Sequence, residues 1–166
     1  MEPTYTMRCG TSVSIVPMSA HEIAAELPED HARLYGLEWT LDADGSRSFA
    51  AYVDGSIAAY SVNRDEGRVL HHGLVERIGG PQGVGRVVFA HDGLVLSSEP
   101  DRDAWIVDAA HPRMDSLLRT LGYAPSGMTT PGTYRFAIDV SAAKKRKTLR
   151  KRMKSVLSAF IRSYSR

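Results

Sequence analysis

Cysteine is nearly absent from this chain of 166 residues, which contains only Cys9. A single cysteine excludes an intramolecular disulfide and a cysteine-based metal cluster, and we expect no metal site. No apolar run approaches the length of a membrane span, so we also expect no transmembrane helix. The first five residues, Met1 to Tyr5, lack the basic and apolar regions of a signal peptide. These absences predict a cytoplasmic protein.

Lysine is missing from most of the chain, because every lysine lies after Val140. Up to that residue, 11 basic residues stand against 19 acidic ones, a net charge of −8. Residues 141–166 hold the other ten basic residues and no acid, a net charge of +10. Such asymmetry favours contact between the tail and a polyanion or an acidic surface.

The composition is otherwise that of an ordinary globular protein. Hydrophobic residues make up 43% and charged residues 24% of the chain. The length is sufficient for one domain with a real core. We expect a domain at 1–140 and a separate basic helix at 141–166.

The most informative stretch runs from Phe49 to Phe89. Two apolar runs flank Asp54-Gly55, a pair that supplies the positive φ angles of a tight hairpin turn. A third strand is expected over 68–75. A glycine-rich turn over 79–85 follows, and glycine lets the backbone approach an anion closely at the start of a helix. Residues 83–96 fit either a helix or a hairpin around Asp92-Gly93, and we favour the helix.

The remaining elements complete a recognisable order. We expect a strand over 8–16, one or two helices over 20–37 with Ser19 as a cap, and a buried strand over 104–110. A helix should run from Pro112 to Leu121, followed by two strands over 123–140. The predicted order is β-α-α-β-β-β-α-β-α-β-β, a mixed α/β (α+β) sheet flanked by helices.

The tail combines an apolar stripe with a cluster of cations. Apolar residues recur at helical spacing from Leu149 to Tyr164, which predicts packing on the body or on a second copy in a homodimer. The basic half could contact nucleic acid, an anionic membrane or the acidic body, and we favour nucleic acid. The expected nucleic-acid-binding residues are Lys144, Lys145, Arg146, Lys147, Arg150, Lys151, Arg152 and Lys154.

Two motifs in this order resemble the GCN5-related N-acetyltransferase (GNAT) family. The first is the turn Gly80-Pro-Gln-Gly-Val-Gly85, similar to the Gln/Arg-x-x-Gly-x-Gly/Ala turn of that family. Gly80 stands where Gln or Arg is usual. The second is the strand Ile106 to Ala110 followed by Leu117-Leu-Arg-Thr-Leu-Gly-Tyr123. The resemblance covers residues 8–140.

The resemblance implies a GNAT-like, mostly antiparallel sheet and acetyl-CoA as co-substrate. The glycine turn would hold the pyrophosphate through backbone amides, and a backbone N–H near Leu74 or Val75 would meet the thioester oxygen. The residues that it assigns to the co-substrate are Leu74, Val75, Gly80, Gln82, Gly83, Val84, Gly85 and Arg86.

The sequence departs from the family where the chemistry would occur. Leu118 replaces the tyrosine that often protonates the departing thiolate, and His111 stands where an asparagine often ends the strand. An amine must lose a proton before it attacks a thioester, so we take His111, His72 and Glu76 as catalytic candidates. His71 and Asp108 are further candidates, although His71 and His72 should face opposite sides of a strand.

The expected function is therefore acyl transfer from acetyl-CoA to a primary amine. The basic tail favours DNA as the acceptor, and phages encode GNAT-like proteins that modify DNA. An aminoalkyl-modified base of phage DNA, inside a bacterial host, would be a good nucleophile. The alternatives are transfer to a small amine or a protein, and an inactive GNAT-like module that binds nucleic acid.

Overall fold

The computed structural model describes residues 2–27, 48–99, 101–109 and 112–165, without the side chains of residues 73–76. Within these ranges a nine-stranded sheet has the order β7-β8-β6-β5-β4-β3-β2-β1-β9. Its neighbouring strands are antiparallel except for β5 and β6, which run parallel. The predicted fold class, a mixed and mostly antiparallel sheet flanked by helices, is confirmed.

The amino-terminal segment forms two strands where one was expected. β1 (Thr4–Met7) and β2 (Ser12–Met18) pair around a turn in which Gly10 has a φ of +94°. The helix α1 (Ala20–Glu26) then begins as predicted, with Ser19 accepting from the Glu22 backbone N–H in a capping box. The expected continuation of the helical region toward Leu37 lies outside the described residues.

The predicted meander forms the centre of the sheet. β3 (Ser48–Val53) and β4 (Ser56–Glu66) meet in a hairpin whose turn residues Asp54 and Gly55 have φ angles of +51° and +80°. β5 (Val69–Arg77) pairs with β4 along its length. The Asp54-Gly55 turn was therefore predicted correctly from the sequence.

The second half alternates helices and strands. The helix α4 (Val84–Leu96) follows the glycine turn, so the helical alternative for this segment is confirmed. The elements after it are β6 (Ala104–Ala109), α5 (Pro112–Leu121), β7 (Ala124–Thr130) and β8 (Thr133–Asp139). None of the helices in the described ranges is long and apolar enough to cross a membrane.

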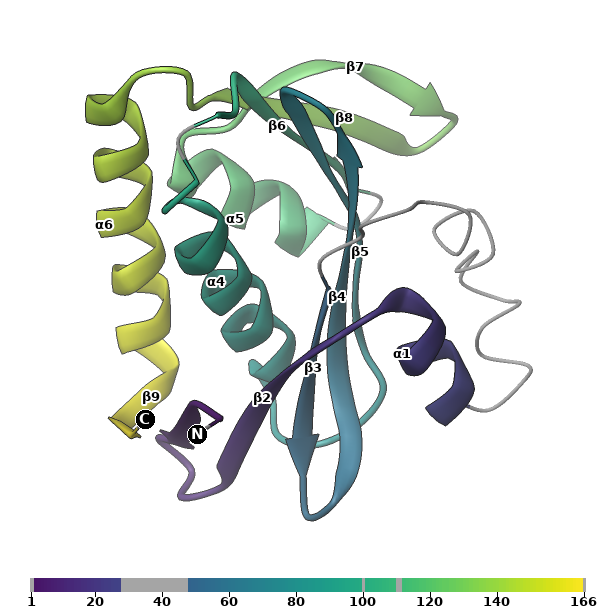
Figure 1. Ribbon diagram of the computed structural model, residues 1–166, viewed down its shortest axis with the longest axis vertical. Coiled ribbons are helices and arrows are strands. Elements are labelled where there is room, and N and C mark those ends of the chain that lie inside the picture. The colour runs from purple at the N-terminus through teal and green to yellow at the C-terminus, as the bar shows by residue number, and fades with distance from the viewer. Residues whose placement is uncertain (1, 28–47, 100, 110–111, 166) are drawn as a thin grey trace.

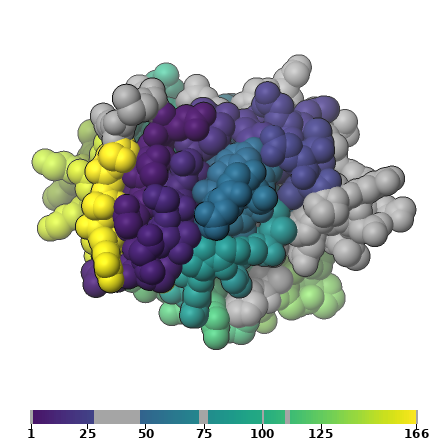
Figure 2. Space-filling model, turned by 90° about the horizontal axis from the view of Figure 1, so that it is seen from below, coloured from purple at the N-terminus to yellow at the C-terminus, as the bar shows by residue number. Residues whose placement is uncertain are grey.

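The tail is a helix followed by a strand. α6 (Ala143–Phe160) ends before the apolar stripe does, and β9 (Ile161–Ser165) pairs with β1. Ile161 and Tyr164 therefore belong to a strand, because Ile161 is already extended with φ −108° and ψ 152°. Figure 2 shows this last segment, in yellow, beside the purple amino-terminal strands.

The helices form layers on the sheet (Figure 1). α4 and α5 cover one face, α1 lies on the other, and α6 lies outside α4 as a further layer. Leu149, Met153 and Leu157 of α6 are buried in the main core with the apolar side of α4. The apolar stripe of the tail thus packs on the body of the same chain, one of the two arrangements that its pattern allowed.

Candidate active site

Two strands separate in the middle of the sheet. β5 and β6 pair only from Val69↔Ala104 to His72↔Val107, so in the described residues the last five residues of β5 have no partner on that side. Backbone N–H and C=O groups on this edge are therefore available to a ligand. Leu74 and Val75, expected to hold a thioester oxygen, lie in this segment and pair with Val62 and Ser61 of β4 on the other side.

The glycine turn leads directly from this edge into α4. Gly83 caps the helix with a φ of +94°, a left-handed conformation that other residues rarely adopt. The N–H groups of Val84 and Arg86 bond to Pro81 and Gly83 within the turn. Among the described residues, the N–H groups of Gly83 and Gly85 meet no backbone acceptor, so they can bind an anion at the positive end of the helix dipole.

A cleft of about 270 Å³ opens at this helix end. Of the residues that the resemblance assigned to the co-substrate, Gln82, Gly83, Gly85 and Arg86 line this cleft. Val84 is fully buried, and Gly80, with a φ of +67°, accepts a hydrogen bond from Arg77 at 2.7 Å. Leu117, from the second motif, also lines the cleft, together with residues outside both motifs: Arg77, Phe89, Arg113, Met114 and Phe160.

The cleft is positively charged and has one wall from the tail. Arg77, Arg86 and Arg113 come from β5, α4 and α5, and no acidic residue is among the described residues that line the cleft. Phe160, at the end of α6, lies so close to Gly83 that a Cβ there would be 2.4 Å from its ring. The Arg86 guanidinium lies 5.3 Å from the centre of the same ring, within cation–π distance.

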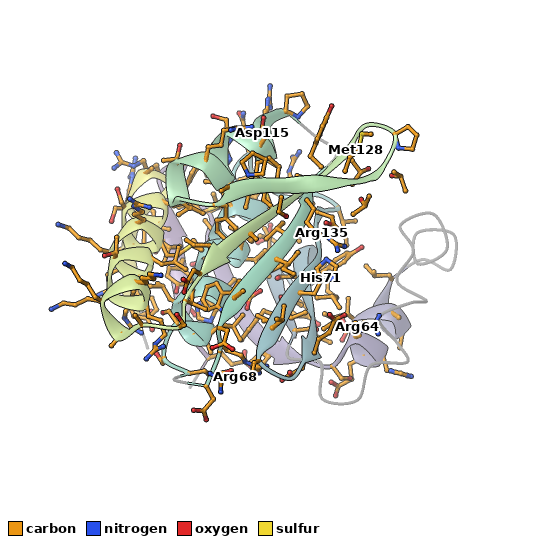
Figure 3. All side chains as sticks on the ribbon, turned by 90° about the horizontal axis from the view of Figure 1, so that it is seen from above. Arg64, Arg68, His71, Asp115, Met128 and Arg135 are labelled. Carbon is orange, nitrogen blue, oxygen red and sulfur yellow. The ribbon has the colours of Figure 1, made fainter. Side chains whose placement is uncertain are left out.

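A polar cluster lies on the opposite face of the sheet, where the strands begin to part. His71 Nε2 of β5 is 3.2 Å from Asp108 Oδ2 of β6, and Arg135 of β8 donates to both oxygens of Asp108 at 2.8 and 3.0 Å. Figure 3 shows His71 and Arg135 on the side of the sheet away from α6, with Arg64 further along. The sequence indicated His71 and Asp108 separately but not their contact.

The environment of this cluster sets its charges. Burial lowers the pKa of His71, Asp108 opposes this shift and Arg135 adds to it, so the imidazole is neutral at pH 7. Burial would raise the pKa of Asp108, but the hydrogen bonds and charge of Arg135, with a contribution from His71, hold it below its usual value. Because His71 is neutral at pH 7, we attribute the ionised state of Asp108 mainly to Arg135.

His72 points to the other face, as the alternation of a strand requires. It is 1% exposed under α4, between the rings of Phe89 and Trp105 at 5.4 and 5.5 Å. Its Nδ1 lies 3.5 Å from Asp92, a buried carboxylate that accepts hydrogen bonds from Ser61 and Asn63, but neither ring nitrogen of His72 has a hydrogen-bond partner among the described residues. Because the ring is enclosed between helix and sheet and does not line the cleft, we leave His72 out of the catalytic proposal.

Two other catalytic candidates cannot be placed by their side chains. Glu76 lies on β5 opposite Tyr60, but its side chain is outside the described part of the structure. His111 falls outside the described residues altogether. Leu118, at the position of the usual tyrosine, is fully buried, and a leucine side chain has no proton to donate.

The eight tail cations from Lys144 to Lys154 divide into two groups. Arg146, Arg150 and Arg152 donate to main-chain carbonyl groups, and Lys145 pairs with Asp139. The side chains of the other four make no hydrogen bond or ion pair with a described residue, and these four exposed residues follow one another at spacings of three and four along α6. We call these the lysine stripe: Lys144, Lys147, Lys151 and Lys154.

Comparison with known proteins identifies the architecture. No protein-family model matches the sequence, and no curated protein matches it by sequence. The structure is similar to the GNAT domain of S. lividans PAT, with a TM-score of 0.60, 16% identity, and coverage of 83% of this chain and 96% of that domain.

Two further solved structures have the same arrangement. The ribosomal-protein-S18-alanine N-acetyltransferase of Escherichia coli gives a TM-score of 0.57 and 15% identity over 79% of this chain and 96% of its own. A GNAT family acetyltransferase from Elizabethkingia anophelis, crystallised with acetyl-CoA bound, gives a TM-score of 0.57 at 11% identity. The match covers 76% of this chain and 97% of that chain. At these identities the likeness concerns the fold, and this chain has the fold of the GNAT acetyltransferases.

Proposed function

We propose that this protein is an acyl-CoA-dependent N-acyltransferase that transfers an acetyl group from acetyl-CoA to a primary amine. The observation that carries the proposal is the glycine turn at the start of α4. Gly83 and Gly85 present N–H groups there, beside the unpaired edge of β5. An anion-binding helix end next to a gap between strands suits a long phosphorylated thioester.

The residues of the cleft fit the co-substrate. The N–H groups of Gly83 and Gly85 would hold its pyrophosphate, with Arg77, Arg86 and Arg113 supplying opposite charge. The unpaired backbone of β5 near Leu74 and Val75 would bind the acyl arm and donate to the carbonyl oxygen.

The chemistry needs a neutral amine. Its nitrogen attacks the carbonyl carbon, the carbon–sulfur bond breaks, an amide forms and the thiolate leaves. We assign the first proton to His71, which is neutral at pH 7 and lies where β5 and β6 part. Asp108 would orient the ring and stabilise the imidazolium, as a carboxylate does beside a catalytic histidine. The second proton, which the nitrogen loses as the amide forms, would pass through water to the thiolate, since Leu118 has no proton to give.

The test is binding followed by turnover. Acetyl-CoA at millimolar concentration should raise the melting temperature by mass action, whereas CoA-free acetyl donors should not. Acetylation of a panel of primary amines, followed by mass spectrometry, should show the gain of one acetyl group. His71→Gln should slow turnover by about a hundredfold while acetyl-CoA affinity is retained. Binding without turnover on any amine would favour the inactive module, and no binding would contradict the proposal.

A nucleic-acid acceptor is the second candidate, and the lysine stripe favours it. If its four lysines meet phosphates, log affinity for duplex DNA should fall with log salt at a slope of about −3.6. DNA bearing aminoalkyl-modified bases would then be acetylated and ordinary DNA would not, because exocyclic base amines are poor nucleophiles. Replacing the stripe by glutamine should abolish DNA binding at unchanged stability. Unchanged DNA binding would leave small amines or proteins as acceptors.

A further inference from the structure

A second cavity lies at the other end of α4. It has a volume of about 630 Å³ and lies between the last turns of α4, the second half of α6 and the edge formed by β1 and β9. None of the residues that line the coenzyme cleft lines this cavity. Its volume is within the range typical of small-molecule sites.

One largely buried histidine lines this cavity and has a ring nitrogen without a hydrogen-bond partner among the described residues. His91 is 9% exposed, and Tyr5 contacts its Nδ1 at 2.7 Å. The hydrogen bond to Tyr5 is the one that the described residues make with this ring, none reaches Nε2, and His91 lines the cavity. A polar atom in this position calls for a ligand or water.

The protonation state of His91 follows from its surroundings. Burial lowers the pKa of His91, and neighbouring Asp92 only partly opposes this, so the imidazole is neutral at pH 7. A phenol is a stronger acid than a neutral imidazole, and an imidazole nitrogen is the better acceptor. Tyr5 therefore donates to Nδ1, and Nε2 carries the proton toward the cavity as a donor.

The charges around the cavity select the ligand. Arg150 and Lys154 of α6 line it, and no aspartate or glutamate is among the described residues that do. Arg150 is held in place by bonds from its Nη1 to Leu94 and Ser98 at 3.2 and 2.7 Å. A fixed donor and two cations suit an anionic head group.

The apolar side chains in the walls of the cavity indicate what the remainder of the ligand should be. Leu94, Val95, Leu157 and Ile161 line the cavity together with Tyr164, which stacks on Tyr5 at 4.9 Å. Such walls suit an apolar body attached to the anionic head. We propose that this cavity is a second ligand site for a small amphipathic carboxylate, with His91 Nε2 and Lys154 binding the carboxylate.

The probe is sodium octanoate, measured by isothermal titration calorimetry and by the NMR signal of the His91 ring. We expect saturable binding and a shift of that signal. His91→Phe should weaken binding at least tenfold, because it removes a hydrogen bond to a charged group. Lys154→Gln should weaken it by up to about fivefold, as for a pair at the surface.

Two further variants serve as controls, and their readout is octanoate binding, which does not require acyltransferase activity. Lys151→Gln removes an exposed lysine of the same helix that does not line the cavity, and should leave binding unchanged. Val95→Trp fills the mouth from a half-exposed position and should abolish binding. Non-saturable octanoate binding, equal affinity in all four variants, or equally tight binding of 1-octanol would each overturn the proposal.

Discussion

Gly83 shows how one residue can serve both the backbone and a tertiary contact. Its positive φ lets the chain turn from β5 into α4, and the missing side chain leaves room for Phe160. Gly10 has the same φ of +94°, but a Cβ there would meet nothing within 4 Å. An alanine at Gly10 would therefore suffer backbone strain alone, whereas an alanine at Gly83 would also clash with Phe160.

We predict that Gly83→Ala is much more costly than Gly10→Ala. The left-handed conformation should cost about 1 kcal/mol in both variants. Gly83→Ala should lose roughly 1–3 kcal/mol more, because Phe160 must move, and it should also weaken acetyl-CoA binding. Urea unfolding of both variants measures the difference in their free energies of unfolding. Equal losses of unfolding free energy would mean that Phe160 can move aside at no cost.

The buried histidines predict how stability depends on pH. Burial lowers the pKa of both His71 and His91 in the folded protein. Below about pH 6.5 the unfolded chain binds protons that the folded one does not, so the free energy of unfolding should fall as the pH decreases from there toward the folded pKa values.

His71→Gln should reduce this loss, since glutamine can still donate to Asp108 but does not titrate. The measurement is the change in unfolding free energy between pH 7.5 and 5.5 in wild type and variant. His21 is exposed and makes His21→Gln a suitable control, for which we expect the wild-type dependence. An undiminished loss in His71→Gln would show that His71 is not the titrating group.

At the scale of elements, α6 joins two sites. Its last residue in helical conformation, Phe160, forms a wall of the cleft at the start of α4, where we propose that acetyl-CoA binds, while Leu157 and Lys154 line the second cavity. Its inner face is held by apolar packing and by arginines that donate to main-chain carbonyl groups, such as Arg152 to Leu121 at 2.9 Å. The positive charge of the tail is thus only partly available to a partner.

We predict that Phe160→Ala weakens acetyl-CoA binding about tenfold, because the cleft loses its wall and Arg86 loses its aromatic contact. Phe160→Leu keeps most of the volume without the ring and should show an intermediate effect. Calorimetric titration with acetyl-CoA measures both. If Phe160→Ala bound acetyl-CoA with wild-type affinity, α6 would not contribute to acetyl-CoA binding.

At the scale of the whole molecule, the two ends of the chain complete one sheet. β9 covers the outer edge of β1 with pairs such as Tyr5↔Tyr164, so β1 is not left as an open edge. The acidic body and the basic tail, opposite in charge along the sequence, are packed into one core. A chain without the tail is therefore expected to lose stability, so any loss of ligand binding in it could reflect unfolding.

We predict that a chain ending at Val140 does not unfold cooperatively. It would expose the surface that buries Leu149, Met153 and Leu157, each contributing roughly 1.5–3 kcal/mol, a total comparable to the stability of a domain. A chain ending at Phe160 keeps these contacts and should retain a cooperative transition at lower temperature. Circular dichroism during heating distinguishes the two, and a stable chain ending at Val140 would make the tail an independent unit.

The sequence by itself determined the local features. The Asp54-Gly55 hairpin, the Ser19 cap, the glycine turn and the order of central strands all follow from residues close in the chain, because turn and cap conformations depend on local backbone preferences. The motif spacing was enough to indicate the GNAT fold, and four of the residues in its first motif line the cleft at the start of α4.

Only the tertiary structure decided which distant residues meet. Nothing local indicates that Phe160 reaches Gly83, that His71 and Asp108 lie 3.2 Å apart, or that Arg77 and Arg113 share a cleft. The end of α6 was missed for the same reason: residues 161–165 continue the helical apolar pattern, but pairing with β1 outweighs it. Strand pairing and side-chain packing between distant segments are energies of the assembled fold, and a local pattern cannot specify them.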